Sequence, residues 1–388
     1  MGELNLPDVL YYRRAGLSLL RGEPVRIENT YVYVVEFFYR LFGPRELFPV
    51  FLNILLGASF PLFAYLLARR LGAGPRAALL GSLVLFLPSS LAYTSLLLKD
   101  ALVASLFLLA FSACLVWPRL AFLGPALAWV GLAFLPGLRP YLVFPLAGAL
   151  SLAGILAPRR REMAGLLGAA LVGLYFAWAV ASGVLQAARL VTDGPAGVSG
   201  TVYGVVYEVE RVRRDLYGGG DSSFGRGLSP WEAVFWAVFS YLLAPFPWMW
   251  PRVPGWRGVL LGLEMVAWYG FLALALLGMA RWVRGRKGAG EAGEGGGKGG
   301  EPAAGSGGAG RGAEEAGEGN EMAGSWREER RPIFWATVAA ILLTGVVVGT
   351  FASNAGALQR LRLPVLPLVG ALAAVGASGF RSRRRLLQ

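Results

Sequence analysis

Six ionisable side chains interrupt the long apolar runs of this chain, and their types limit the chemistry it can carry. Lys99 and Asp100 stand side by side between two runs rich in leucine and alanine, and Asp8 precedes the first run. The others are the arginines of two short polar turns, Arg139, Arg360 and Arg362. Carboxylates take protons from hydroxyl groups, and clustered cations hold phosphate oxygens. We therefore take Asp8 and Asp100 as candidate catalytic residues and the four cations as candidate contacts to a lipid phosphate.

Each of these positions also has a purely structural interpretation. Asp100 would stand in the first turn of the helix that follows it, where a carboxylate stabilises free N–H groups. The arginines would anchor helix ends at the membrane surface by extending their side chains to the headgroups. Both interpretations stay open, because ionisable residues at membrane depth also tend to mark functional sites. Glu264, inside a later apolar run, would either hydrogen-bond a neighbouring helix or line the same cavity.

The composition removes several classes of chemistry. The chain has no histidine, so catalytic triads and metal sites built on histidine are excluded. Its single cysteine, Cys114, lies in an apolar run and has no second cysteine for an intrachain disulfide. The glycine-rich stretch GGGKGG at 295–300 lacks the upstream glycine and the Ser/Thr of a phosphate-binding loop. We expect no metal and no cofactor.

The elements that must position the six residues are transmembrane helices. The chain has 388 residues, of which 55% are hydrophobic, and a mean hydropathy of +0.54. Apolar runs near the length that crosses a bilayer recur along it. The sequence predicts an all-α integral membrane protein, a polytopic helical bundle with about nine transmembrane helices. The expected spans are 47–69, 77–98, 101–117, 120–136, 141–157, 163–184, 257–280, 333–352 and 364–380.

Clusters of cations predict how these spans are oriented. With nine spans, all five clusters fall on one side of the membrane, which the positive-inside rule makes cytoplasmic. The clusters are Arg69/Arg70/Arg76, Arg119, Arg159–Arg161, Arg281/Arg284/Arg286/Lys287 and Arg381/Arg383/Arg384/Arg385. They explain the net charge of +13 without nucleic acid. We expect a multi-pass plasma-membrane protein with a cytoplasmic C-terminus and residues 1–46 outside. That stretch has no apolar run and no signal peptide, and one explanation is a first span missing from the sequence.

This topology divides the chain into six regions. They are, in order, 1–46 (outer-face segment), 47–184 (spans one to six), 185–256 (outer-face segment), 257–281 (span seven), 282–332 (cytoplasmic linker) and 333–388 (last two spans and basic cytoplasmic tail). In the second outer segment, 231–250 is apolar but broken by Pro245 and Pro247, which predicts a re-entrant or interfacial helix. In the linker, 288–325 is rich in Gly, Glu and Ala and is predicted to be disordered.

Three stretches carry a family resemblance. They are DVLYYRRAGLSLLRGEP (8–24), the long stretch 40–102 that ends in LLLKDAL, and RLRLPVLPLVGALAAVGA (360–377). They resemble the first outer loop, the second and third spans, and the Arg-Tyr-Arg-x-Pro stretch that opens a late span of the GT-C membrane glycosyltransferases. The nearest branch is the bacterial family related to protein mannosyltransferases and lipid A aminoarabinose transferases, glycosyltransferase family 39. Two features depart from the family pattern: its first span is absent, and its Asp-Glu pair is reduced to Asp8 after Pro7.

The resemblance implies a GT-C-like bundle with outer-face re-entrant or interfacial helices. It also implies transfer of a hexosyl or pentosyl group from a polyprenyl-phosphate donor to an envelope glycan, lipid or protein at the outer face. Asp8 would then be the base, and Arg360 or Arg362 would contact the phosphate. Two alternatives stay open, a transporter or flippase for a lipid-linked glycan and a non-catalytic membrane protein that keeps the fold. The expected partners are the lipid-linked sugar, the membrane lipid and the acceptor, and not nucleic acid.

Overall fold

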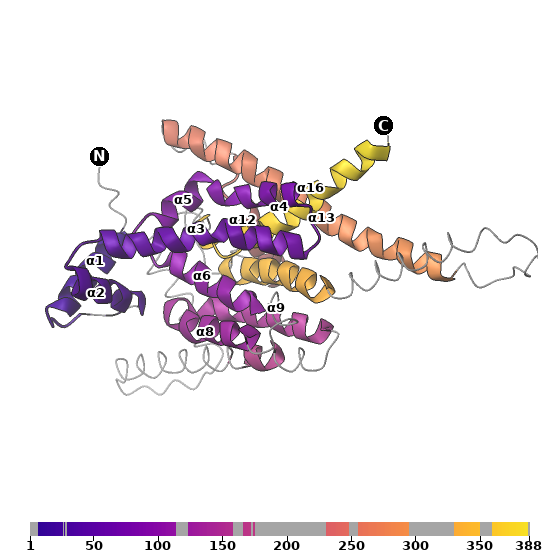
Figure 1. Ribbon diagram of the computed structural model, residues 1–388. Coiled ribbons are helices and arrows are strands. Elements are labelled where there is room, and N and C mark those ends of the chain that lie inside the picture. The colour runs from indigo at the N-terminus through magenta and orange to yellow at the C-terminus, as the bar shows by residue number, and fades with distance from the viewer. Residues whose placement is uncertain are drawn as a thin grey trace, which may run out of the picture.

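The computed structural model describes a helical protein (Figure 1). The described residues are 7–113 apart from 26 and 28, then 123–157, 166–171, 174, 230–247, 255–294, 330–349 and 359–386. Across these ranges every regular element is a helix, and no strand occurs. The expected outer segment at 185–229 and the linker at 295–325 lie outside the described residues.

Within 7–111 the helices follow one another through short turns. In chain order they are α1 (Pro7–Leu20), α2 (Tyr31–Phe42), α3 (Leu47–Arg70), α4 (Pro75–Ser82), η1 (Leu83–Phe86), α5 (Pro88–Thr94), α6 (Asp100–Phe111), α8 (Leu123–Leu138), η2 (Pro140–Leu142), α9 (Val143–Leu156), α12 (Pro230–Leu243), α13 (Trp256–Glu294), an unlabelled helix Arg330–Gly349 and α16 (Leu366–Leu386).

Within the described part of the chain, three helices are long and apolar enough to cross a bilayer: Leu47–Arg70, Gly258–Arg284 and Arg330–Gly349. The first of them agrees with the span expected at 47–69. The other apolar helices of the described residues have 10–17 residues, and a helix needs about 20 to span the hydrocarbon core. The structure therefore supports a helical membrane protein, while the count of nine spans and the GT-C arrangement stay predictions.

The span expected at 77–98 is not one straight helix. Pro75–Phe86 and Pro88–Thr94 are long and apolar enough to cross a bilayer only when they are taken together. They are bent by 64° at Leu87. Pro88 explains the break, because proline has no N–H for the helix and its ring clashes with the preceding turn. The pair makes a fourth, broken span or a re-entrant loop.

The seventh helix is much longer than expected. The sequence predicts a span at 257–281 followed by a linker, but α13 continues without a break to Glu294. Residues 282–294 are thus helical, which corrects the predicted start of the linker at 282 and of its disordered part at 288. Residues 330–332, the predicted end of the linker, belong to the next helix. A helix already formed by the apolar stretch extends at low cost, because each added residue gains a hydrogen bond without a new nucleus.

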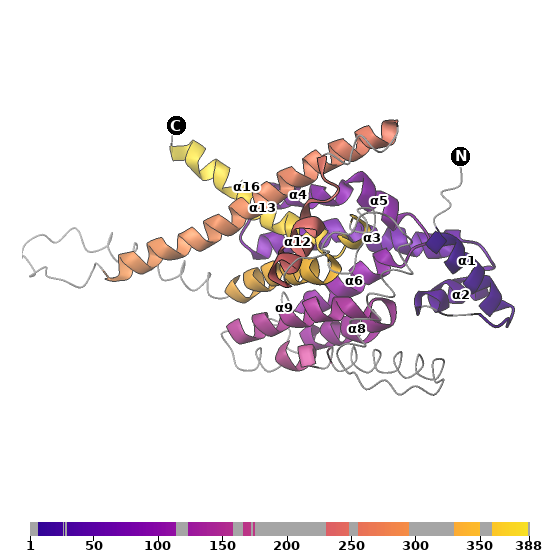
Figure 2. The same cartoon turned by 180° about the vertical axis from the view of Figure 1, so that it is seen from behind.

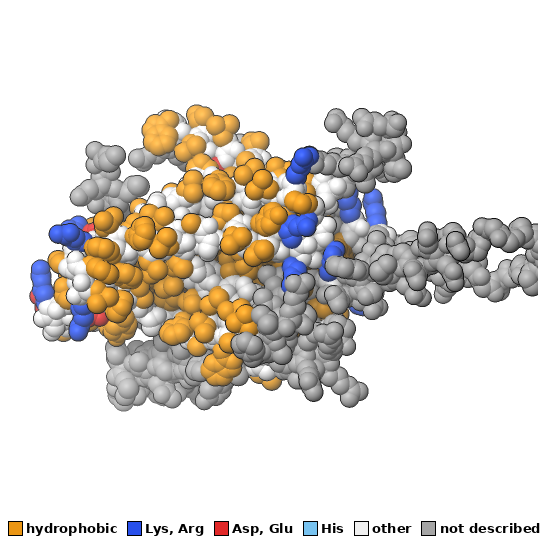
Figure 3. Space-filling model, in the orientation of Figure 1, with side chains coloured by type: hydrophobic (Ala, Val, Ile, Leu, Met, Phe, Trp, Pro, Cys, Tyr) orange, Lys and Arg blue, Asp and Glu red, His pale blue; other side chains and the backbone are white. Residues whose placement is uncertain are grey.

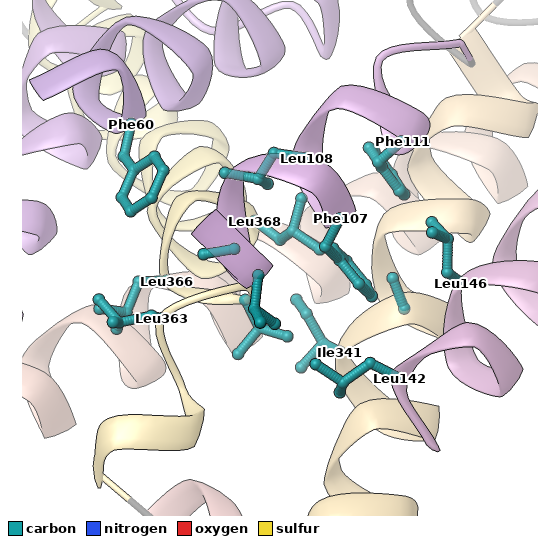
Figure 4. Packing of buried hydrophobic residues seen from close by; sticks show 14 of the residues in the cluster. Phe60, Phe107, Leu108, Phe111, Leu142, Leu146, Ile341, Leu363, Leu366 and Leu368 are labelled. Carbon is teal, nitrogen blue, oxygen red and sulfur yellow. The ribbon is translucent and has the colours of Figure 1, made fainter. Parts of the chain in front are cut away.

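Close contacts between small residues hold α16 inside the bundle. A Cβ on Gly81 of α4 would lie 2.2 Å from the Gly370 carbonyl oxygen, and one on Gly376 would lie 2.0 Å from the Leu274 carbonyl oxygen of α13. Such glycines let helix backbones approach closely, the common way in which helices pack in membranes. Figure 4 shows part of the apolar core, where Leu368 of α16 lies beside Phe107 of α6.

The two ends of the bundle differ in charge. Helices α1 and α2 lie at one end, and the C-terminus lies with the far end of α13 at the other (Figures 1 and 2). Figure 3 shows apolar side chains over the flank between them, mixed charges around α1 and α2, and Lys and Arg among the coloured side chains at the opposite end. α3 ends there with Arg69 and Arg70. This asymmetry is the one that the positive-inside rule uses, and the cytoplasmic placement of the basic end and the C-terminus stays a prediction.

Candidate functional site

Four chain segments meet at the end of the bundle near α1. They contribute Asp8 from α1, Asp100 from the start of α6, Arg139 from the turn after α8, and Arg360 from the turn before α16. The four side chains form one line of ion pairs, Arg139 to Asp100 to Arg360 to Asp8. Arg360 is the shared member: its Nε lies 2.5 Å from Oδ2 of Asp100, and its Nη1 donates to Asp8. Residues 352 positions apart in the sequence are thus in direct contact.

The line of ion pairs runs from the protein interior to its surface. The side chains of Asp100 and Arg139 are 2% and 7% exposed, whereas that of Asp8 is 47% exposed. Arg360 stands between them at 21%. Burial works against the charge of Arg360, but Asp100 and Asp8 outweigh it and raise the pKa of the guanidinium above its usual range. The inner pair is therefore a fixed element, and the outer contact of Arg360 with Asp8 is open to exchange.

The carboxylate of Asp100 binds arginines and does not cap its helix. Lys99 is the N-cap residue of α6, and no side-chain cap hydrogen bond is made there. Oδ1 of Asp100 accepts from Nη2 of Arg139, and Nη1 of Arg139 donates to the Tyr141 hydroxyl at 3.0 Å. Asp100 does stand in the first turn of α6, as expected, but its carboxylate bonds arginines and makes no cap hydrogen bond.

Lys99 lies beside this line of ion pairs. It is half-buried, and no carboxylate of the described residues lies within ion-pair distance of its ammonium group. Lys99 lies in the turn between α5 and α6, outside the membrane-spanning segments. Burial and the nearby Arg139 lower the pKa of Lys99 to about 8. The site thus holds three basic side chains, Lys99, Arg139 and Arg360. It holds two acidic side chains, Asp8 and Asp100, which leaves one basic group in excess.

Arg362 is directed elsewhere. Its Nε donates to the Tyr241 carbonyl at 2.5 Å, and its Nη2 donates to the Ala244 carbonyl. Its guanidinium also lies over the Trp268 ring, 5.3 Å from the centroid. The side chain is 4% exposed and satisfies the carbonyls at the C-terminal end of α12. Of the two arginines, Arg360 belongs to the line of ion pairs, whereas Arg362 bonds the end of α12.

Glu264 joins two helices. Its carboxylate accepts hydrogen bonds from the backbone N–H of Ser89, at 3.0 Å, and from the Ser89 hydroxyl. Ser89 is the second residue of α5, where backbone N–H groups have no partner within the helix. Of the two interpretations of Glu264, the structure thus contains the hydrogen bond to a neighbouring helix.

The sequence analysis missed four polar residues around the site. Asn53 of α3, fully buried, donates to the backbone just before Lys99. Tyr12 lies one turn after Asp8 on α1 and accepts from the Asn29 amide at 3.2 Å. Its ring packs edge-on against Tyr31 at 4.9 Å. The available signal was a lone amide at position 53, inside a run that is otherwise apolar.

No group of three or more His, Cys, Asp or Glu side chains that could hold a metal ion occurs within the described residues.

The chain was also compared with known proteins. No protein-family model, no curated protein and no solved structure matched it.

Proposed function

We propose that the protein is a membrane glycosyltransferase that moves a sugar from a polyprenyl-phosphate donor to an envelope glycan, lipid or protein at the outer face. The observation that carries the proposal is the meeting of Asp8, Lys99, Asp100 and Arg360 from distant segments at one end of an apolar bundle. A donor with a lipid tail would reach this end from the bilayer. A sugar acceptor would reach it from the aqueous side.

The cations fit a phosphate group. Lys99 has no acid partner among the described residues, and Arg360 holds its outer carboxylate at a half-exposed position. A guanidinium binds phosphate oxygens in a fork, and an ammonium group adds a point charge beside it. Arg139 would not touch the donor in this proposal, because its guanidinium is buried against Asp100 and Tyr141. It would hold the Asp100 carboxylate in place, and Asp100 would in turn hold Arg360.

Asp8 fits the role of general base. A phosphate that takes Nη1 of Arg360 displaces Asp8, whose exposed carboxylate is then free to accept a proton. The acceptor hydroxyl gives its proton to Asp8 while its oxygen attacks the anomeric carbon from the side opposite the phosphate. The bond from that carbon to the phosphate oxygen breaks, and the electron pair leaves with the polyprenyl phosphate. Lys99 and Arg360 stabilise the charge that develops on this oxygen.

The test is transfer of labelled sugar from a polyprenyl-phosphate donor by the full chain in proteoliposomes. We expect Asp8→Asn to lose about 10²–10⁴-fold in rate, the usual contribution of a general base. Glu46→Gln is the matched control. Glu46 is a half-exposed acid that pairs with Arg13 of α1 at 2.9 Å, and the substitution should leave the rate unchanged. Full activity in Asp8→Asn would remove Asp8 as the base, and equal losses in both variants would point to a structural effect.

A second candidate function is a flippase for a lipid-linked glycan. The broken helix pair Pro75–Phe86 and Pro88–Thr94 favours it, because transporters often build their sites from interrupted helices. The same cations would then hold a phosphate without breaking a bond. Movement of a fluorescent polyprenyl-phosphate sugar across proteoliposomes, with no product formed on any acceptor, would replace the transferase by this function.

A further inference from the structure

An amide side chain inside α3 holds the turn that carries Lys99 and Asp100. Asn53 is fully buried. Its Nδ2 lies 2.7 Å from the Leu96 carbonyl and 2.7 Å from the Leu98 carbonyl, so its two N–H bonds point at the backbone just before Lys99. Residues 95–99 are not helical, and they join α5 to α6.

Within the turn the Leu98 N–H bonds the Leu96 carbonyl at 2.8 Å, and Asn53 adds a donor from α3 to that carbonyl and to the carbonyl of Leu98. Leu97 and Leu98 are buried, so water does not reach the carbonyls of the turn freely. Buried backbone outside a regular helix is tolerated only where protein groups satisfy its polar atoms. Asn53 supplies both bonds from one side chain, which fixes the path of the chain on each side of Leu97.

The face of α3 that carries Asn53 is shaped to receive the turn. Gly57, one helical turn further on, meets the end of α5 so closely that a Cβ there would lie 2.7 Å from Cβ of Thr94. Asn53 also lies 3.1 Å from the Tyr31 hydroxyl, and Tyr31 packs against Tyr12 of the helix that bears Asp8. The Asn53 amide thus bonds the turn that carries Lys99 and Asp100 directly, and it is linked through Tyr31 and Tyr12 to the helix that carries Asp8.

We propose that Asn53 is a positioning residue, which fixes the 95–99 turn so that the ammonium group of Lys99 and the carboxylate of Asp100 face the donor phosphate. Asn53 itself would touch no substrate. The inference rests on the proposed function for the identity of the ligand, but the geometry of Lys99 can be measured without any substrate.

Lys99 is a reporter of this geometry. Its pKa is lowered to about 8 first by burial and then by Arg139, and the other charged groups that act on it are Asp100, Arg360 and Asp8. Without the Asn53 amide the turn should open toward water. The desolvation of the ammonium group would then fall, and its pKa should move up toward the usual 10.5.

The composition of the chain makes the measurement direct. Lys99, Lys287 and Lys298 are the only lysines, so Lys287→Arg with Lys298→Arg leaves Lys99 alone. The full chain is dimethylated in detergent with ¹³C-formaldehyde and a borohydride reductant. The Lys99 signal, told apart from that of the N-terminal amine by its loss in Lys99→Arg, is followed by NMR as the pH is raised. Dimethylation keeps the charge of the amine.

In this background we expect Asn53→Ala to raise the pKa of Lys99 by one unit or more. The matched control is Ser59→Ala, which removes a polar group of α3 whose hydroxyl donates to the Leu56 carbonyl of the same helix. It should leave the signal unchanged. If Asn53→Ala does not fold, Asn53→Ser decides, because a single hydroxyl cannot replace both bonds, and it should raise the pKa by a smaller amount.

Each outcome has a distinct meaning. A Lys99 pKa that is the same in a folded Asn53 variant and in the parent overturns the positioning role, whatever the sugar-transfer assay gives. A raised pKa, with a donor KM that rises more than kcat falls, supports it. A raised pKa in a protein whose parent transfers no sugar supports the geometry and overturns the proposed function instead.

Discussion

Replacing Asp100 by Asn should destabilise the fold far more than the same change at Asp8. Both carboxylates pair with arginine, but the Asp100 side chain is 2% exposed and the Asp8 side chain is 47% exposed. Removing one partner of a buried pair costs about 3–5 kcal/mol, because the other charge stays buried without compensation. Removing one partner of an exposed pair costs about 0–1 kcal/mol. The expected difference in the free energy of unfolding is therefore about 2–5 kcal/mol, or about 30- to 4,000-fold in the unfolding equilibrium.

The assay is equilibrium unfolding of the purified chain by SDS in mixed micelles, followed by the fluorescence of its 12 tryptophans. Arg139→Gln completes a double-mutant cycle with Asp100→Asn. Since the two side chains are in contact, the double variant should be less destabilised than the sum of the single variants, by about 0.5–3 kcal/mol. Equal midpoints for Asp8→Asn and Asp100→Asn, or strict additivity in the cycle, would refute the reasoning that Asp100 is the buried centre of the site.

Three further predictions address the phosphate contact, the broken helix pair and the packing. Because the folded-state pKa of Lys99 is about 8 and that of an unfolded lysine is 10.5, the unfolded chain binds more protons between these values. Stability should then rise with pH across pH 8–10.5, and binding of polyprenyl phosphate, measured by isothermal titration calorimetry, should weaken above about pH 8. Glu264→Gln should still accept the Ser89 N–H but lose the charge-assisted bond, which should lower the SDS midpoint less than Glu264→Ala does. Gly81→Leu should destabilise strongly in the same assay, because its side chain would collide with the Gly370 backbone, whereas Gly270→Leu, at an open position, should not.

The sequence predicts the parts of this fold that depend on local composition. The span at 47–69 agrees with α3 because charged residues flank an apolar run on both sides. The break at Leu87 was missed, although Pro88 is a sequence signal for a helix break. The span was predicted from hydropathy averaged over a window, and such an average does not register a single proline. The long α13 was missed because a Gly/Glu-rich composition says nothing of the helix that enters it.

For the candidate site too, the sequence predicts what depends on position along the chain and misses the contacts between helices. Counting spans placed Asp8, Lys99, Asp100, Arg139 and Arg360 at one end, and the structure brings them together there, although their roles in transfer stay predictions. The sequence could not say which arginine pairs with which acid, because those contacts join different helices. It also could not separate the two arginines of the RLR stretch. In a helical turn, residues two apart point in nearly opposite directions, and only one of them faces the acids.

The contact between Asp8 and Arg360 has a consequence for how the protein is made. The two residues are 352 positions apart, and a ribosome adding about 5–20 residues per second needs roughly 20–70 s to pass from one to the other. During that time α1 has no Arg360 to bind, and the inner acid has only Arg139. The ionic site therefore forms late in biosynthesis, after the helices that precede Arg360 have been made. A nascent chain stalled before position 360 should hold α1 loosely, and protease should cut it there far faster than in the finished protein.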